Sequence, residues 1–140
     1  MRILGFSKKW DKLNKQWFES DYHTFTTFRF PRKDRDWEVE EVVQIVYKPR
    51  SKEREPLGIA RIIRKQEKDL GKKYYEFNGV NKSPDVLTPD DAKEDGFTGM
   101  HGGGDIEKMM KFLSDSYGYC AIRDNPMNQL TLYWIERFSL

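Results

Sequence analysis

A segment rich in threonine and phenylalanine contains the side chains best suited to chemistry in this sequence. It reads HTFTTFRFPRKDR over 23–35 and includes four cations. Its β-branched and aromatic residues favour a strand, and side chains along a strand point alternately to opposite faces. If Phe25 points inward, Thr27 and Arg29 share its face. A hydroxyl would then lie beside a guanidinium, which can bind a carboxylate or a phosphate in two-point fashion.

Arg29 needs a partner if this strand is covered on both faces, as the phenylalanines on both faces indicate. Burying a cation without a partner costs several kcal/mol. Two solutions remain open. Arg29 pairs with a carboxylate, for which Asp95 is the best candidate, or it lines a cleft and accepts the anionic group of a ligand.

Two basic loops are candidates for binding phosphate. One follows the threonine/phenylalanine strand and carries Arg32 and Lys33; the other is bounded by Pro49 and Pro56 and carries Lys48, Arg50, Lys52 and Arg54. If both loops flank one opening, they form a basic rim, and aromatic residues are available for stacking on bases, namely Trp37, Tyr47, Tyr74 and Tyr75. The alternative is a solvated surface in which acids such as those at 34–41 neutralise the cations.

Charge is distributed unevenly along a nearly neutral chain. The formal net charge is +2, but residues 1–70 hold 17 Lys and Arg against 12 Asp and Glu, whereas residues 71–140 hold 8 against 11. A local basic surface of this kind attracts polyanions. We therefore expect RNA or a nucleotide as the partner, with a protein partner as an alternative.

Composition limits the class of protein. The 140 residues are 37% apolar and 34% charged, which predicts a single polar domain over 1–140. No apolar run approaches the roughly 20 residues of a membrane helix, and the N-terminal apolar stretch is too short for a secretory signal, so we expect a cytoplasmic protein without membrane contact. Cys120 is the single cysteine and the two histidines lack ligand spacing, so we expect neither metal nor cofactor.

The pattern of strands and helices predicts an α+β fold that is mainly β. We expect strands over 25–30, 41–47, 57–64, 73–77 and 129–138, and a short helix or helical turn with one apolar face within 7–19. Many short strands favour closure into a small barrel. The expected architecture is an antiparallel-dominated β-barrel with two or three short helices over one side.

Two helices are expected late in the chain. Thr88 is suited to cap a helix that has Pro89 at its first position and ends before Gly96. Asp105 caps a second helix, which carries an apolar stripe and ends at Gly118. The triple glycine 102–104 is expected to be a flexible hinge between them.

Four segments together resemble the ASCH domain of the PUA-like superfamily across nearly the whole chain. They are TTFR at 26–29, LGIARI at 57–62, LTPDDAKEDGF at 87–97 and KMMKFLSDSYG at 108–118, followed by a final strand. The most specific part is Ala92, Asp95, Gly96 and Phe97. The resemblance implies a pseudo-barrel with a cleft between the threonine/arginine strand and the Asp-Gly-Phe helix, and a role in binding RNA or acting on nucleosides.

One branch of that family resembles N4-acetylcytidine amidohydrolases, in which a lysine, a threonine and a glutamate form the catalytic set. By this resemblance the threonine corresponds to Thr27 and the acid to Asp95, which are the catalytic candidates. The lysine position is occupied by Thr24, so the lysine that would activate the nucleophile is missing. Thr24 joins Arg29, Arg32, Lys33, Lys48 and Arg50 as a candidate for binding ligand.

Three functions follow from these patterns. The first is an RNA- or nucleotide-binding module with a polar cleft and a basic rim. The second is a hydrolase that acts on a modified nucleoside or on RNA, as an amidohydrolase or a ribonuclease, with Asp95 as base and Thr27 as nucleophile or hydrogen-bond donor. The third is an adaptor whose basic loops meet an acidic protein.

Overall fold

The computed structural model describes residues 1–8, 10–13, 23–99 and 102–138. The chain separates into two compact units. The first comprises Met1–Thr26, Asp36–Lys65 and Leu130–Leu140, and the second comprises Thr27–Arg35 and Gln66–Gln129. The prediction of one domain over 1–140 stays a prediction.

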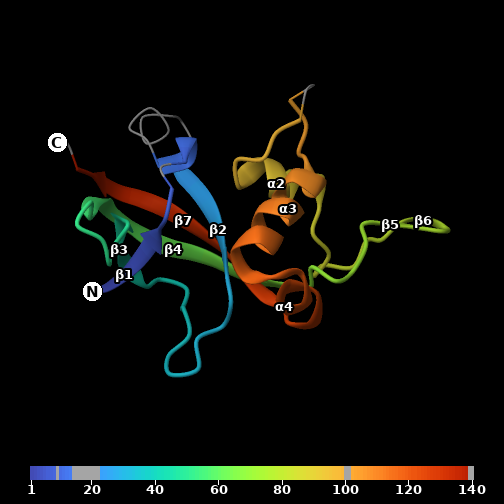
Figure 1. Ribbon diagram of the computed structural model, residues 1–140, viewed down its shortest axis with the longest axis horizontal. Helices are drawn as coiled ribbons and strands as arrows, with labels where there is room; N and C mark the ends of the chain where they lie inside the picture. The colour runs from blue at the N-terminus through green and yellow to red at the C-terminus, as the bar shows by residue number, and fades with distance from the viewer. Residues whose placement is uncertain (9, 14–22, 100–101, 139–140) are drawn as a thin grey trace. The chain divides into compact units, whose positions relative to one another are not determined.

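A curled, half-barrel sheet of five strands dominates the fold (Figure 1). The strands follow the order β1-β3-β4-β7-β2, with bounds β1 Arg2–Phe6, β3 Val42–Tyr47, β4 Glu55–Lys68, β7 Met127–Arg137 and β2 Thr24–Arg29. Strand β1 runs parallel to β3, and β3 runs antiparallel to β4. The predicted class, α+β and mainly β, is confirmed.

The core of the first unit forms where alternate strand residues point to one side of this sheet. Val43 and Ile45 of β3 are completely buried, as period-2 alternation predicts. Phe25 lies against Trp134 with ring centroids 4.9 Å apart. The remaining members of the cluster are also apolar: Leu4, Phe6, Leu13, Trp37, Leu57, Ala60, Ile62, Leu130 and Leu132.

Strand β1 was not predicted from the sequence. Its pairing with β3 joins residues about 40 positions apart, with Leu4 opposite Ile45. Gly5 of β1 lies close to the turn that follows β3, since a Cβ added to Gly5 would be 2.7 Å from Pro49 Cγ. The first strand therefore fixes the position of the basic turn that begins at Lys48.

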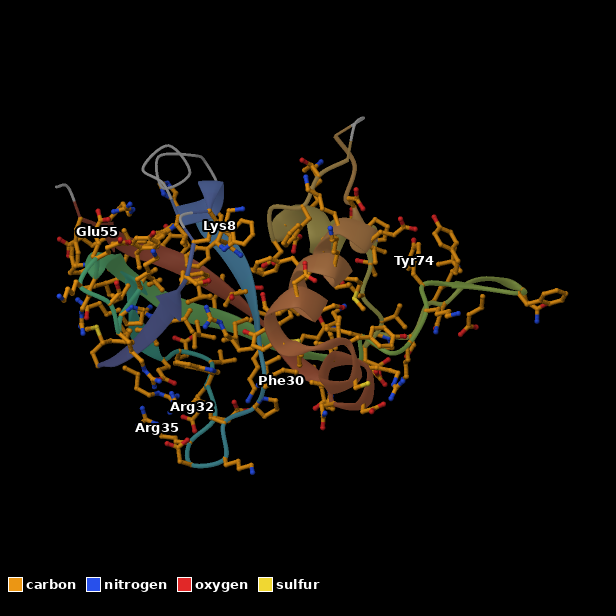
Figure 2. All side chains as sticks on the ribbon, viewed as in Figure 1. Lys8, Phe30, Arg32, Arg35, Glu55 and Tyr74 are labelled. Carbon is orange, nitrogen blue, oxygen red and sulfur yellow. The ribbon has the colours of Figure 1, made fainter. Side chains whose placement is uncertain are left out.

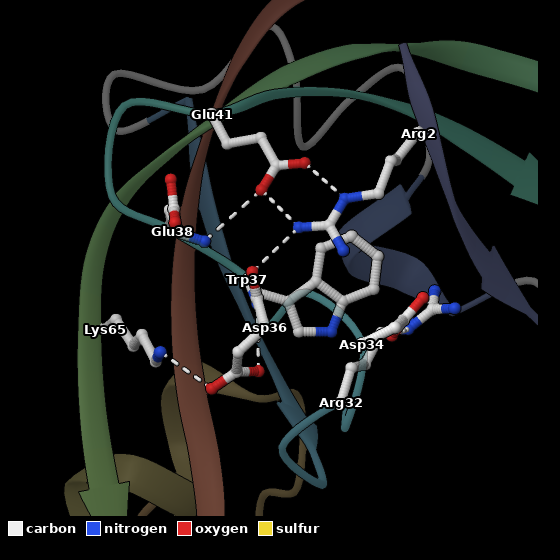
Figure 3. Close-up of polar contacts among 8 residues, drawn as sticks. All are labelled: Arg2, Arg32, Asp34, Asp36, Trp37, Glu38, Glu41 and Lys65. Carbon is white, nitrogen blue, oxygen red and sulfur yellow. Dashed lines mark hydrogen bonds and ion pairs between the residues drawn. The ribbon is translucent and has the colours of Figure 1, made fainter.

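Arg2 ties β1 to the acidic segment that precedes β3 (Figure 3). Its Nε donates to Glu41 Oε2 at 2.6 Å, and its Nη2 donates to Glu41 Oε1 and to the carbonyl of Asp36. The guanidinium also lies 4.3 Å from the ring centroid of Trp37, and Asp36 accepts a bond from Lys65 at 2.8 Å. Acids of this segment thus neutralise cations inside the first unit.

Three short helices are present in the described part of the second unit: α2 Pro89–Glu94, α3 Ile106–Tyr117 and α4 Tyr119–Asp124. The predicted helix starts are confirmed. Thr88 and Asp91 form a reciprocal capping box, and the Asp105 side chain accepts a bond from Lys108 N–H. Met109 and Leu113 bury one face of α3, which ends at Gly118.

Gly104 is a site of close backbone approach, which the hinge prediction for 102–104 did not anticipate. A Cβ added to Gly104 would lie 1.6 Å from the carbonyl oxygen of Pro89 in α2. Gly104 also forms a β-bridge with Thr98. Glycine is therefore needed there for packing between the start of α2 and the segment before α3.

Other predictions differ from the structure in extent. The segment 73–77 forms only the two-residue strand β5 (Tyr75–Glu76), which pairs with β6 (Gly79–Val80) in an exposed hairpin. Within 7–19, the described residues contain a 3₁₀ turn, η1 (Asp11–Leu13), and 14–22 lie outside the described residues. Helix α4 was not predicted, and Cys120 within it is exposed.

No helix in the described residues is both long and apolar enough to cross a membrane.

Candidate functional site

The second half of β2 brings Thr27 and Arg29 together, as the alternation of the strand predicts. Arg29 Nε donates a hydrogen bond to Thr27 Oγ1 at 3.1 Å. Thr27 is 5% exposed, whereas Arg29 is partly exposed. Because the hydroxyl holds Nε, the plane of the guanidinium is fixed relative to the strand.

The charge of Arg29 is partly balanced by its surroundings in the second unit. Burial lowers the pKa of Arg29, and Tyr117 and Asp95 act electrostatically in the opposite direction. An arginine nonetheless stays protonated at any physiological pH. Asp95 thus acts on the pKa of Arg29 while Arg29 stays partly exposed to solvent, and the ion pair between them stays a prediction.

Helix α2 and the residues just after it position Asp95. Ala92 is completely buried and Phe97 is 4% exposed, so both anchor the segment in the apolar interior. Asp95 N–H donates to Asp91 O at 3.1 Å, and Gly96 then turns the chain with φ of +102°. This left-handed conformation favours glycine. The Ala-x-x-Asp-Gly-Phe spacing therefore places a buried carboxylate at the helix end.

Tyr117 is a site residue that sequence reasoning missed. It lies at the last position of α3 and is 41% exposed. Its ring packs edge-on against Phe30 with centroids 5.1 Å apart, and Tyr117 acts to raise the pKa of Arg29. A tyrosine at the polar end of an amphipathic helix is a weak signal for such a role, because tyrosine joins an apolar ring to a polar hydroxyl.

The loop after β2, where Figure 2 labels Arg32 and Arg35, carries cations and belongs to the same unit as Arg29. Arg32 and Lys33 are both exposed. Arg32 forms a loose ion pair with Asp34, with Nε 3.5 Å from Oδ1. No ion pair of Lys33 occurs among the described residues, so Lys33 carries an uncompensated charge at this loop.

The remaining three candidates, Thr24, Lys48 and Arg50, belong to the first unit. Lys48 and Arg50 line an open surface hollow of about 430 Å³ together with Phe6 and Pro49. Lys48 Nζ donates to Glu53 at 2.7 Å, and Glu53 and Tyr47 raise the pKa of this lysine. The exposed Arg50 makes no ion pair within the described residues.

A second buried polar cluster, not predicted from the sequence, lies in the second unit. Lys68 is 4% exposed and its ammonium is 2.9 Å from Asp91 Oδ2. Gln129 donates to the other carboxylate oxygen at 3.0 Å. These contacts hold the start of α2 in place, because Asp91 also belongs to the capping box of that helix. We therefore assign this cluster to stability and not to ligand binding.

Among the described residues, no group of three or more His, Cys, Asp or Glu side chains is arranged to hold a metal ion. His23 instead lies near Tyr133, with ring centroids 6.0 Å apart.

We found no protein-family model, curated protein or solved structure that matches this chain.

Proposed function

We propose that the protein is an RNA- or nucleotide-binding module in which Thr27, Arg29, Asp95 and Tyr117 recognise part of the ligand. The observation that carries this proposal is the state of Arg29, which is oriented by Thr27, balanced by Asp95 and still partly exposed. A guanidinium in a fixed plane can recognise phosphate or the edge of a base with directional N–H groups.

The chemistry around Arg29 favours a nucleic acid over a small carboxylate. The same unit carries exposed cations at Arg32 and Lys33, directly after β2. A single carboxylate needs only one cation, whereas a polyanionic chain gains from several cations spaced along a loop. The resemblance to the ASCH domain supports the same ligand class.

The test is the salt dependence of RNA binding, measured by fluorescence anisotropy with a labelled single-stranded 12-mer between 50 and 300 mM KCl. Release of two to four counterions gives a log–log slope of about −1.5 to −3.5. Affinity that stays flat over this range would contradict the proposal.

Two variants distinguish the contribution of the Thr27–Arg29 hydrogen bond to RNA binding from that of the Arg29 charge. Arg29→Met removes the guanidinium and is expected to weaken binding about tenfold or more, as for a charge-assisted hydrogen bond of roughly 1.5–3 kcal/mol. Thr27→Val keeps the shape of the side chain but removes the acceptor for Arg29 Nε, so a smaller loss is expected. Equal affinity of wild type and Arg29→Met would remove Arg29 from the proposed site.

A further inference from the structure

The hairpin of β5 and β6 displays large aromatic side chains that are mostly exposed. Phe77, at the turn between the two strands, is fully exposed at 103%, and Tyr75 is 71% exposed. Figure 1 shows the two short strands as a narrow extension of the chain. Scattered single apolar residues on a surface need no explanation, but two large rings on one small hairpin indicate a binding role.

The hairpin has a defined shape in spite of its exposure. Asn81 N–H donates to Tyr74 O at 2.7 Å, and Asn81 Nδ2 donates to Glu76 Oε1 at 2.9 Å. Tyr74 and Tyr75 contact edge to face, with centroids 4.7 Å apart. The aromatic rings are therefore presented on a hydrogen-bonded turn, which lowers the entropy that a ligand must remove on binding.

An open hollow of about 670 Å³ lies beside these rings. Its lining combines the aromatic rings with polar and charged side chains, which include one carboxylate: Tyr75, Phe77, Lys72, Lys73, Glu76 and Asn81. Lys72 is paired with Asp85 at 2.6 Å. Lys73 is exposed and has no ion pair within the described residues. The hollow thus joins aromatic surface to two lysines and to one carboxylate, Glu76, which accepts a bond from Asn81.

We propose that this hairpin binds unpaired nucleobases of single-stranded RNA by stacking on Phe77 and Tyr75, while Lys73 contacts a neighbouring phosphate. This inference rests on the proposed RNA-binding function and adds a second contact region to it. Alternation of aromatic rings with cations is the pattern that binds single strands without strict sequence preference, because every base has a π-face. A purely apolar protein partner would leave Lys73 without a counterpart.

Substitutions at Phe77 test stacking directly, because its full exposure means that they leave the fold intact. We would measure anisotropy of a labelled single-stranded 12-mer RNA and of the same sequence as a duplex. Phe77→Ala is expected to weaken single-strand binding about 5- to 150-fold, from roughly 1–3 kcal/mol per stacked base. Phe77→Trp should keep the affinity, and Phe77→Leu, which is apolar without a π-face, should lose it.

The slope of log affinity against log salt concentration distinguishes base stacking from contacts with phosphate. Phe77→Ala should leave the slope unchanged, whereas Lys73→Gln should reduce its magnitude by about 0.7, the value for one phosphate contact on a single strand. The matched control is Tyr119→Ala, which removes another exposed aromatic ring of the same unit outside the hairpin. It should bind RNA as tightly as the wild type.

The outcomes separate this inference from the proposed function. If wild type binds RNA and Arg29→Met weakens it, but Phe77→Ala binds normally, the hairpin role is overturned and the proposed function stands. Wild-type affinity of Phe77→Leu, or equal affinity for single strand and duplex, would also overturn stacking. If wild type binds no RNA at all, both proposals fail.

Discussion

The ammonium of Lys68 lies 2.9 Å from Asp91 Oδ2, and both side chains are largely enclosed within the second unit. The same ammonium donates to the carbonyl oxygens of Pro84 and Val86 at 3.2 and 3.1 Å. Asp91 in turn accepts bonds from Thr88 N–H and Gln129. The pair therefore joins β4, the segment before α2 and the start of β7 through one connected set of hydrogen bonds.

Removing the lysine of this pair should destabilise the protein strongly. Breaking a buried ion pair by removing one partner costs about 3–5 kcal/mol. We expect Lys68→Met to cost about 3 kcal/mol, near the lower limit, because Asp91 keeps its bonds to Thr88 and Gln129. The measurement is the free energy of unfolding from urea titration followed by circular dichroism.

The matched control for that substitution is Lys72→Met. Lys72 forms an ion pair of similar length with Asp85, but this pair is exposed. Exposed pairs contribute about 0–1 kcal/mol, so a small effect is expected. Equal destabilisation by the two substitutions would show that enclosure of the Lys68–Asp91 pair does not determine its contribution.

Stability should fall in acid partly because of Asp91. Burial raises the pKa of Asp91, but bonds from Thr88, Lys68 and Gln129 outweigh it and leave the pKa below its ordinary value. The unfolded chain then binds more protons than the folded one at low pH. The contribution of Asp91 is therefore fully present above its unfolded pKa of about 3.9 and is lost as pH falls through the folded pKa.

Urea titrations of wild type and Asp91→Asn between pH 2 and pH 7 test whether the contribution of Asp91 to stability is lost in acid. The difference in unfolding free energy should be largest near neutral pH and shrink below about pH 4. A difference that stays constant, or grows in acid, would show that Asp91 is not the titrating group.

Neighbouring glycines provide a test of the packing between α2 and the segment that precedes α3. Gly104→Ala would place a Cβ 1.6 Å from Pro89 O, whereas a Cβ at Gly103 meets no atom within 4 Å. We expect Gly104→Ala to cost about 1–3 kcal/mol or more, because backbone must move, and Gly103→Ala to stay within about 0.5 kcal/mol. Thermal unfolding of the two variants compares them, and similar melting temperatures would be inconsistent with this packing.

Local signals in the sequence predicted the starts of α2 and α3, because a cap depends on residues only three positions apart, whereas α4 has no side-chain cap and was missed. The Thr88 and Asp105 caps are examples. The close approach at Gly104 was missed for the opposite reason, since it depends on the backbone of another helix. The parallel pairing of β1 with β3 was missed likewise, because five residues of modest apolarity do not reveal a distant partner.

The site was partly predictable for the same reasons. Alternation along one strand predicted that Thr27 and Arg29 share a face, and the structure shows the bond between them. The contacts of Tyr117 with Phe30 and of Lys68 with Asp91 were not predictable, because each joins residues that are distant in the sequence. The tyrosines and the phenylalanine at 73–77 predicted a regular strand, but the structure has only a two-residue strand there, and it is exposed.

The protein should bind nucleoside ligands without hydrolysing them. Among the described residues, the hydroxyl of Thr27 is hydrogen-bonded only by Arg29, and a guanidinium that stays protonated cannot act as a general base. The predicted resemblance to the ASCH domain would put Thr24 at the position of the activating lysine. We therefore expect no release of acetate from N4-acetylcytidine and no cleavage of a short RNA above the rate in buffer, measured by chromatography.

Asp95→Asn is the decisive variant for this point. In the binding module, it removes the negative charge that acts on Arg29, so it should change RNA affinity, with no turnover in either protein. Turnover by the wild type that is abolished in Asp95→Asn would instead establish the hydrolase and identify Asp95 as its base. Turnover that persists in Asp95→Asn would contradict the binding-only prediction and would place the catalytic base at a residue other than Asp95.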